Sequence, residues 1–237
     1  MMDNPLVFIH GAGDSARAWR EQIAYFGERG HAIDLPGHGE RPDPLPEQVR
    51  VEDYARAVRE IVRNELRLER PVIVGHSLGG LIALQMGLDF GDELAGLVLI
   101  GTGARMRVLP ALLEAARTNP EQALLTLKQF SVAQQGDPTL PARLLNEQSK
   151  LAPGILYRDL LACNGFDVMD RLQELHQIPA LVLCGAEERN APIKFSVYLH
   201  EHIANSTLKI IPGAGHYVQR EKSAEVNHAI AEWLESN

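Results

Sequence analysis

The stretch Gly75-His76-Ser77-Leu78-Gly79-Gly80 decides how this sequence is interpreted. It follows the short apolar run of residues 71–74, which predicts a buried strand, and precedes the longer apolar run of residues 81–86, which predicts a buried helix. Ser77 is therefore expected on a sharp turn from strand to helix. The glycines two residues before and two after it leave room for neighbouring backbone, so the turn can hold the serine hydroxyl outward. The pattern predicts a nucleophile at Ser77.

Two backbone N–H groups are expected beside this serine. The first turn of a helix has N–H groups without helical partners, and Leu78 would provide one of them. The second would come from Ala12, in the loop His10-Gly11-Ala12-Gly13 that follows the apolar strand of residues 6–9. Two such donors can stabilise the oxyanion of a tetrahedral intermediate. The sequence therefore predicts an oxyanion hole formed by Ala12 and Leu78.

A serine hydroxyl is a poor nucleophile at neutral pH and needs an adjacent base. His216 follows the last expected strand, residues 208–211, so it should emerge at the same sheet edge as Ser77. We expect His76 to face away from Ser77. His10 and His38 should lie in turns, and His200 and His202 on a surface helix. His200 and His202 would point to different sides of that helix, so no metal site is expected.

The composition limits the possible partners. The 237 residues are 45% hydrophobic and carry a formal net charge of −8, which argues against a nucleic-acid partner. The first residues lack the basic and apolar segments of a signal peptide, and no apolar run is long enough to span a membrane. We therefore expect a cytoplasmic protein that binds a small-molecule substrate and has no nucleic-acid partner, no membrane partner and no cofactor.

The order of apolar segments predicts an α/β fold. Short apolar strands alternate with helices, among them an amphipathic helix over 51–68 and a closing helix over 221–235. This alternation is typical of a mostly parallel, doubly wound sheet covered on both faces. The strands are expected within residues 6–9, 31–35, 71–74, 94–100, 180–184 and 208–211.

The segment from 105 to 170 interrupts this alternation. It shows helical periodicity broken by prolines and no convincing strand, so we expect a helical cap inserted over the carboxyl ends of the strands. Residues 1–104 and 171–237 would then form the core. Most leucines of the cap should pack it onto the core, and some should line an apolar pocket of modest size.

Four motifs in this order carry a resemblance to a known superfamily: His10-Gly11-Ala12-Gly13, Asp34-Leu35-Pro36-Gly37-His38-Gly39, Gly75-His76-Ser77-Leu78-Gly79-Gly80 and Gly213-Ala214-Gly215-His216. Together they resemble the α/β-hydrolase superfamily, and more closely its compact bacterial carboxylesterases with a helical cap. The resemblance implies an α/β-hydrolase fold with a minimal N-terminus. It also implies a catalytic triad in the order serine, acid, histidine.

The resemblance places the acid after the strand that precedes the last one. The family usually has aspartate there, whereas Gly185-Ala186-Glu187-Glu188-Arg189-Asn190-Ala191-Pro192 places Glu188 at that position. A glutamate can orient and stabilise the histidine in the same way. Glu187 is the alternative, and a third possibility is that both are solvated loop residues.

These residues predict a serine hydrolase, and we expect a carboxylesterase for short- to medium-chain acyl esters with Ser77, His216 and Glu188 as its triad. Fold and triad do not fix the substrate. The alternatives are a lactone or carbon–carbon bond hydrolase, a hydroxynitrile-lyase-like enzyme, and a non-catalytic small-molecule receptor.

Overall fold

The computed structural model describes residues 3–46, 48–147 and 151–237. Six strands form one sheet in the order β2-β1-β3-β4-β5-β6, and all neighbours are parallel. Their bounds are β1 Leu6–Ile9, β2 Gly30–Ile33, β3 Val72–His76, β4 Gly96–Ile100, β5 Ala180–Gly185 and β6 Ser206–Ile211. The predicted parallel sheet is confirmed.

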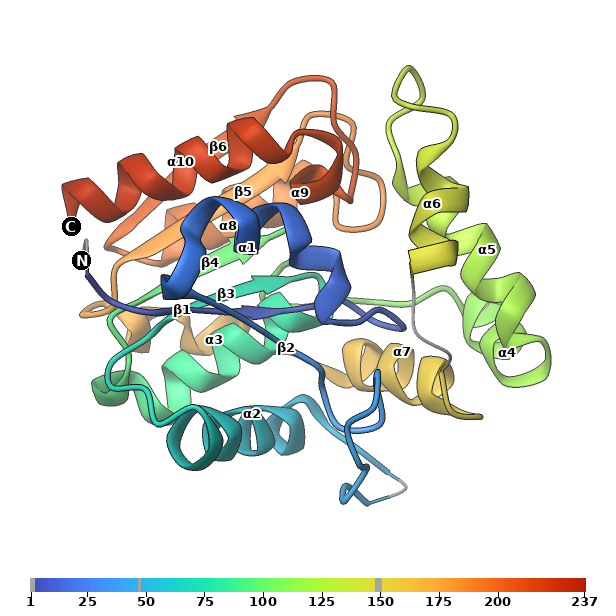
Figure 1. The fold of residues 1–237 in the computed structure, drawn as a ribbon, viewed down its shortest axis with the longest axis horizontal. Coiled ribbons are helices and arrows are strands. Elements are labelled where there is room, and N and C mark those ends of the chain that lie inside the picture. Colours follow the sequence, from blue (N-terminus) through green and yellow to red (C-terminus); the bar gives the residue numbers. More distant parts are fainter. Residues whose placement is uncertain (1–2, 47, 148–150) are drawn as a thin grey trace.

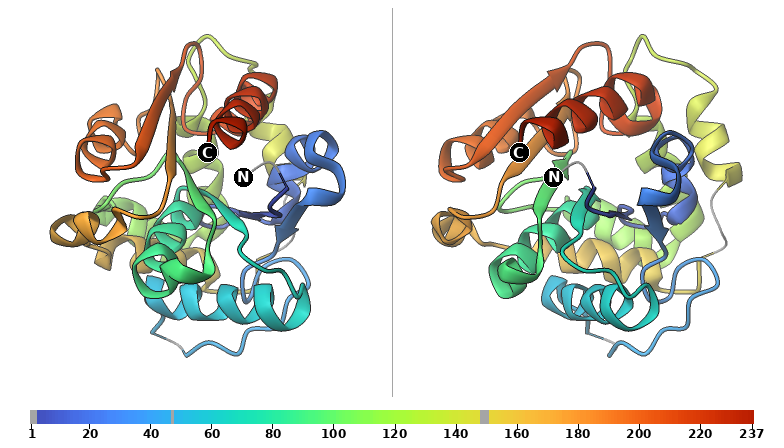
Figure 2. Two further views of the ribbon diagram at one scale, coloured as in Figure 1. Left: turned by 90° about the vertical axis from the view of Figure 1, so that its left-hand side faces the viewer. Right: turned by 60° about the vertical axis from the view of Figure 1, so that its left-hand side comes forward.

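Helices cover both faces of this sheet, as Figures 1 and 2 show. The helices of the core are α1 Arg20–Phe26, α2 Val51–Glu60, α3 Leu78–Phe90, α8 Ile193–His202, α9 Val218–Glu221 and α10 Ser223–Ser236. Helices α2, α3 and α8 pack on one face, and α1 and α10 pack on the other.

Alternate strand residues supply the two cores, because successive side chains of a strand point to opposite faces. In β1, Val7 and Ile9 pack against the α2 and α3 side, whereas Leu6 and Phe8 pack against the α1 and α10 side. All four side chains are fully buried. A strand buried on both faces has to be apolar throughout, which explains the continuous apolar runs in the sequence.

Two predicted helices have different bounds in the structure. The helix expected over 51–68 is α-helical only to Glu60, and a π-helical turn, Ile61–Glu65, follows it. In that turn the N–H of Leu66 donates to the carbonyl of Ile61, at 3.0 Å. The closing helix begins at Ser223 rather than at 221, since α9 is a separate turn.

Among the described residues between β4 and β5, four α-helices lie together at the carboxyl ends of the strands, on the right of Figure 1. They are α4 Pro110–Thr118, α5 Pro120–Ser131, α6 Leu140–Glu147 and α7 Ile155–Gly165. Asn119 caps α5, because its side chain accepts a hydrogen bond from the N–H of Gln122. We call this segment the cap; its exact limits at 105 and 170 stay a prediction.

Candidate active site

The turn at Ser77 has the backbone that the sequence predicts. Ser77 lies between β3 and α3 at φ 53° and ψ −114°, a region that residues with side chains rarely occupy. A Cβ at Gly75 would collide with the carbonyl of Gly79, and one at Gly79 would collide with the carbonyl of Ile9. Both glycines are therefore required for the close approach of β1, β3 and α3, which holds the strained serine at the sheet edge.

The two predicted oxyanion donors belong to segments next to Ser77. Leu78 is the first residue of α3, so its N–H has no helical acceptor. Ala12 follows β1 and lines the same cavity as Ser77. The loop passes close to the serine, since a Cβ on Gly11 would lie 3.3 Å from that of Ser77. Within the described residues, neither the Ala12 nor the Leu78 N–H donates to a protein acceptor.

His216 and Glu188 form a buried pair. Nδ1 of His216 lies 2.7 Å from Oε2 of Glu188, although 28 residues separate them in sequence. An ionised carboxylate can only accept hydrogen bonds, so Nδ1 carries the proton and Nε2 is left as the basic nitrogen. His216 lines the cavity together with Ser77.

Glu188 is held by both of its oxygens. While Oε2 faces His216, Oε1 accepts the N–H groups of Asn190 at 2.7 Å and Ala191 at 3.0 Å. Burial acts to raise the pKa of Glu188, but the charge and hydrogen bond of His216 and these two N–H groups lower it overall. The carboxylate is therefore ionised and fixed in direction.

Glu187, the alternative acid, points elsewhere. Its Oε2 accepts the N–H of Gln134 at 3.0 Å. Of the two neighbouring glutamates, the structure brings Glu188 to His216.

Sequence reasoning missed two residues around the pair. Gly101, at the end of β4, has φ +54°, and a Cβ there would lie 3.1 Å from both Glu188 Oε2 and His216 Nδ1. Ser131, the last residue of α5, accepts the His216 N–H on its carbonyl at 2.7 Å. The sequence did contain a signal for Gly101, because a glycine at the end of a strand often marks a close approach. Nothing near Ser131 in sequence indicates that its carbonyl contacts His216.

His76 does not face away from the site, so that prediction is wrong. Its ring centroid lies 4.6 Å from that of His216, and its Nε2–H donates to the His216 carbonyl at 2.9 Å. Burial, followed by the charge of His216, lowers the pKa of His76 well below its usual value. A neutral His76 therefore supports the loop that carries His216.

The cavity over Ser77 has a volume of about 380 Å³ and lies between the core and the cap. The predicted apolar lining from the cap is present. Apolar cap side chains contribute to it, among them Leu109, Leu112, Leu127, Phe130 and Leu160.

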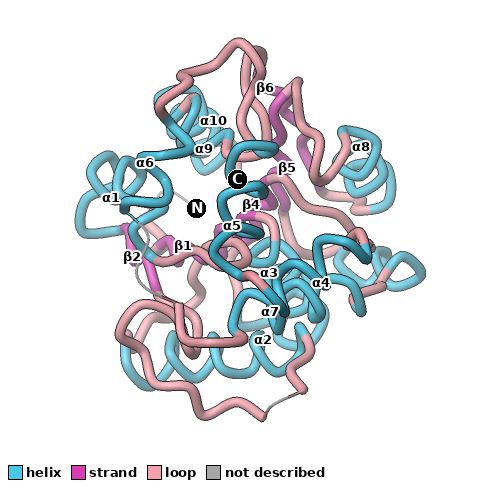
Figure 3. The backbone as a smooth tube through the Cα atoms, turned by 90° about the vertical axis from the view of Figure 1, so that its right-hand side faces the viewer, coloured by secondary structure: helices cyan, strands magenta, loops and turns pink. Residues whose placement is uncertain are grey.

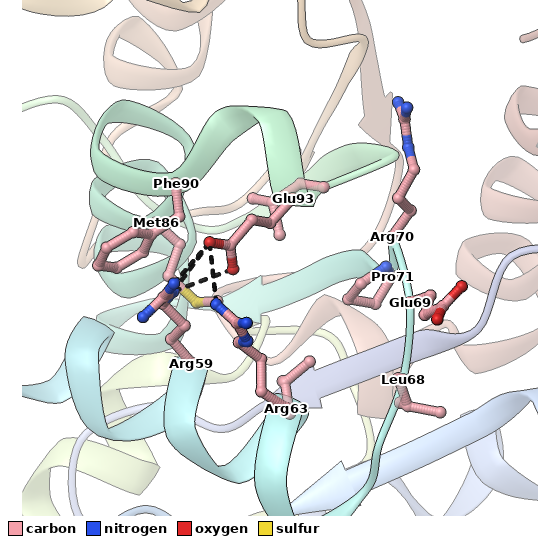
Figure 4. A pocket seen from close by; sticks show the side chains of 11 residues that line it. Arg59, Arg63, Leu68, Glu69, Arg70, Pro71, Met86, Phe90 and Glu93 are labelled. Carbon is pink, nitrogen blue, oxygen red and sulfur yellow. Dashed lines mark hydrogen bonds and ion pairs between the residues drawn. The ribbon is translucent and has the colours of Figure 1, made fainter.

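A second pocket, of about 350 Å³, lies at the opposite end of the sheet, beside Pro71 where β3 begins. Figure 4 shows Arg59 and Arg63 reaching the carboxylate of Glu93 there. Its lining includes no serine, cysteine or histidine, and its Glu93 carboxylate is paired with the two arginines. In the described parts of the chain, no three His, Cys, Asp or Glu side chains are grouped to hold a metal ion. No helix there combines the length and apolar character of a membrane span.

Similarity to known proteins agrees with this geometry. The 3-oxoadipate enol-lactonase 2 of Acinetobacter baylyi is 26% identical over 96% of this chain and 88% of its own length. The 2-hydroxy-6-oxononadienedioate/2-hydroxy-6-oxononatrienedioate hydrolase of Burkholderia vietnamiensis is 25% identical over 97% of this chain and 86% of its own. A solved thermophilic esterase superimposes with a TM-score of 0.85 and 33% identity, covering 99% of this chain and 90% of that one.

The match to a family model is nearly complete along the chain. The model of the alpha/beta hydrolase family aligns with residues 6–229, from β1 into α10. That span contains the turn at Ser77, the cap and the loop of His216. With the all-parallel sheet and the esterase-like structure, the alignment shows that this chain is a hydrolase-fold protein and belongs to the alpha/beta hydrolase family.

Proposed function

We propose that this protein is a serine carboxylesterase for short- to medium-chain acyl esters, with Ser77 as nucleophile, His216 as base and Glu188 as acid. The observation that carries the proposal is the shared cavity: Ser77 and His216 line it, and the imidazole is already paired with Glu188. The 33% identical thermophilic esterase supports the same reading.

The geometry suggests how each group acts. Nε2 of His216 takes the proton of Ser77 as Oγ attacks the ester carbonyl, and Glu188 stabilises the imidazolium that forms. The carbonyl oxygen becomes an anion facing the N–H groups of Ala12 and Leu78. His216 then gives its proton to the departing alcohol, leaving an acyl group on Ser77. Water, deprotonated by His216, attacks this acyl group and releases the acid.

The cavity sets the size of the acyl group. Most of its cap lining is apolar, which favours apolar acyl chains. A volume of about 380 Å³ accommodates a short or medium chain. We expect turnover to fall once the acyl chain exceeds this space.

The test is hydrolysis of p-nitrophenyl esters from acetate to laurate by the native chain and by Ser77→Ala. Turnover should peak at short or medium chains and disappear in the variant, and a rapidly quenched reaction should show acyl mass on Ser77. Native protein that turns over no ester would refute the carboxylesterase proposal and favour a lyase or receptor.

One observation favours a second candidate, a hydrolase of lactones or carbon–carbon bonds in carboxylate-bearing substrates. The Arg107 and Arg189 side chains line the cavity, and no carboxylate side chain of the described residues does so. Arg107 is paired with Asp167, whereas Arg189 forms no ion pair with a described carboxylate. The two curated relatives are named for the dicarboxylates 3-oxoadipate and 2-hydroxy-6-oxononadienedioate.

Matched substrates separate the two candidates. A lactone bearing a carboxylate and its methyl ester are compared on the native chain and on Arg189→Met. Preference for the acid that is lost in Arg189→Met supports the second candidate. Equal rates on the acid and on its methyl ester would contradict the second candidate and favour the carboxylesterase.

A further inference from the structure

Lys128 on α5 is a cation inside the protein. Its side chain is fully buried, and Nζ donates to Oδ2 of Asp14 at 2.8 Å and to the hydroxyl of Tyr217 at 2.7 Å. A buried ammonium is tolerated only where charged and polar partners satisfy it. Burial acts to lower the pKa of Lys128, but Asp14 and Tyr217 raise it overall, so the group stays charged.

Asp159 on α7 is a second charged residue of the cap that lies inside the protein. The carboxylate is fully buried: Oδ2 accepts the N–H of Gly13 at 2.9 Å and faces Nε2 of His38 at 2.8 Å, and Oδ1 accepts the Tyr54 hydroxyl at 2.6 Å. Burial acts to raise the pKa of Asp159, but His38 and these hydrogen bonds lower it overall. This side chain is an ionised anchor rather than a neutral acid.

Lys128 and Asp159 both contact the loop that follows Ala12. Gly13 and Asp14 directly follow Ala12, and the cap contacts one from α7 and the other from α5. Figure 3, viewed from the cap side, shows α5 and α7 in front of the sheet edge. Gly13 has φ +60°, and a Cβ there would lie 2.7 Å from Leu156 of α7 and 3.3 Å from Leu124 of α5. The loop is therefore enclosed by the two helices.

The same ammonium also reaches the second catalytic loop. Tyr217 follows His216 directly, and its hydroxyl is the other partner of Lys128. Burial, and then the negative charge of Asp14, raises the pKa of Tyr217 to about 12, although Lys128 acts against this, so the hydroxyl keeps its proton. One buried cluster thus joins the loop of Ala12 to the loop of His216.

We propose that Lys128 and Asp159 are positioning residues through which the cap fixes the oxyanion donor. The inference rests on the proposed function, in which the Ala12 N–H faces the developing oxyanion. Ala12 has no side chain long enough to orient its own backbone, so the direction of its N–H depends on the residues that follow. The cap holds those residues by charged contacts, and it thereby acts on turnover as well as on substrate choice.

The test compares Lys128→Met and Asp159→Asn with the native chain on the best p-nitrophenyl ester. An oxyanion donor acts in the transition state, so kcat should fall by about 10- to 100-fold, less than for the full loss of a donor, while KM stays close to native. A trifluoromethyl ketone, whose hemiketal with Ser77 places an oxyanion in the hole, should lose affinity in parallel. The alcohol with the same carbon skeleton forms no hemiketal and should bind as before.

Two further variants distinguish a loss of positioning from a general loss of stability. The pair Lys128→Met with Asp14→Asn leaves no lone buried charge, and it should show the same selective loss because the loop contact is still missing. Arg59→Met removes an ion pair with Glu93 at the opposite end of the sheet (Figure 4), so it should lower stability without changing the ratio of ketone to alcohol affinity.

The outcomes distinguish the inference from the function on which it rests. If the native chain hydrolyses esters and the folded variants match it in kcat and ketone affinity, Lys128 and Asp159 have no positioning role. A parallel loss of ketone and alcohol affinity would also overturn the inference, because it indicates a damaged pocket. Absence of native turnover instead refutes the esterase proposal itself.

Discussion

Nδ1 of His216 and Oε2 of Glu188 lie 2.7 Å apart, and the Glu188 side chain is shielded completely from solvent. This contact depends on a glutamate where the family usually has the shorter aspartate. The other carboxylate oxygen, Oε1, accepts the N–H groups of Asn190 and Ala191. The carboxylate is thus fixed from both sides.

Replacing Glu188 by Gln should lower kcat on esters by about 10⁴-fold, because the imidazole loses its preferred tautomer and the charge that stabilises its protonated form. The matched control is Glu187→Gln, which removes the neighbouring carboxylate and should leave turnover nearly native. Steady-state kinetics on p-nitrophenyl esters measures both. Equal losses in the two variants would contradict the role of Glu188.

Gly101→Ala should reduce turnover by about 10²-fold, because the new methyl group displaces the Glu188–His216 pair and small shifts of catalytic groups are costly. Gly27→Ala is the control: Gly27 has φ +60°, close to the +54° of Gly101, and nothing lies within 4 Å of its Cβ position. Both variants should lose about 1 kcal/mol of stability from the backbone conformation. Turnover should fall in Gly101→Ala alone, and a similar fall in Gly27→Ala would argue against a local effect.

The strained backbone of Ser77 should be visible in stability measurements. At φ 53° and ψ −114°, glycine is accommodated far better than alanine. Ser77→Gly should therefore be more stable than Ser77→Ala by about 1 kcal/mol in urea unfolding, although both are inactive. Equal stability of the two variants would show that the turn at Ser77 stores no strain.

The His38–Asp159 pair should make stability depend on pH. Burial acts to lower the pKa of His38, but Asp159 raises it overall, so its stabilising effect is complete below the unfolded pKa of about 6.5. The effect is lost as pH rises through the higher pKa of the folded state. The pKa of Asp159 is lowered, so its contribution is present above about pH 4 and is lost as pH falls further.

The free energy of unfolding in urea, measured from about pH 5 to about pH 9, tests this dependence. The stability difference between the native chain and His38→Gln should be about 3 kcal/mol near pH 5 and should shrink as pH rises. His10→Gln gives the opposite trend: burial and then the charge of His38 lower the pKa of His10 to about 4, so the stability that His10 contributes should rise from pH 5 to about pH 6.5 and stay constant above it. A difference for His38→Gln that stays constant with pH would contradict the charged pair.

Local sequence patterns were sufficient for much of the core. In α10, Val226, Ile230, Trp233 and Leu234 are buried, and their spacing of three or four residues is the helical period that a sequence shows directly. The turn at Ser77 was also predictable, since glycines at fixed spacing between an apolar strand and an apolar helix allow few other structures. These features depend on residues close together in sequence.

The buried charged residues that hold the loops of the site could not be predicted in the same way. The sequence around Lys128 does not mark it as buried, and its burial follows from contacts with Asp14 and Tyr217, each at least 89 residues away in sequence. Asp159 likewise meets His38 across 121 residues. Periodicity indicates which face of a helix is apolar, but it carries no information about which distant carboxylate or hydroxyl will satisfy a buried charge.

The buried charges of the cap have a consequence for protein engineering. Exchanging caps between members of a hydrolase family is a direct route to new substrate ranges, since the cap lines the cavity. In this chain a transplanted cap would remove Lys128 and Asp159 and strand Asp14 and His38 in the core without their partners. A chimera therefore has to exchange these core residues together with the cap, which makes the two parts a single unit of design.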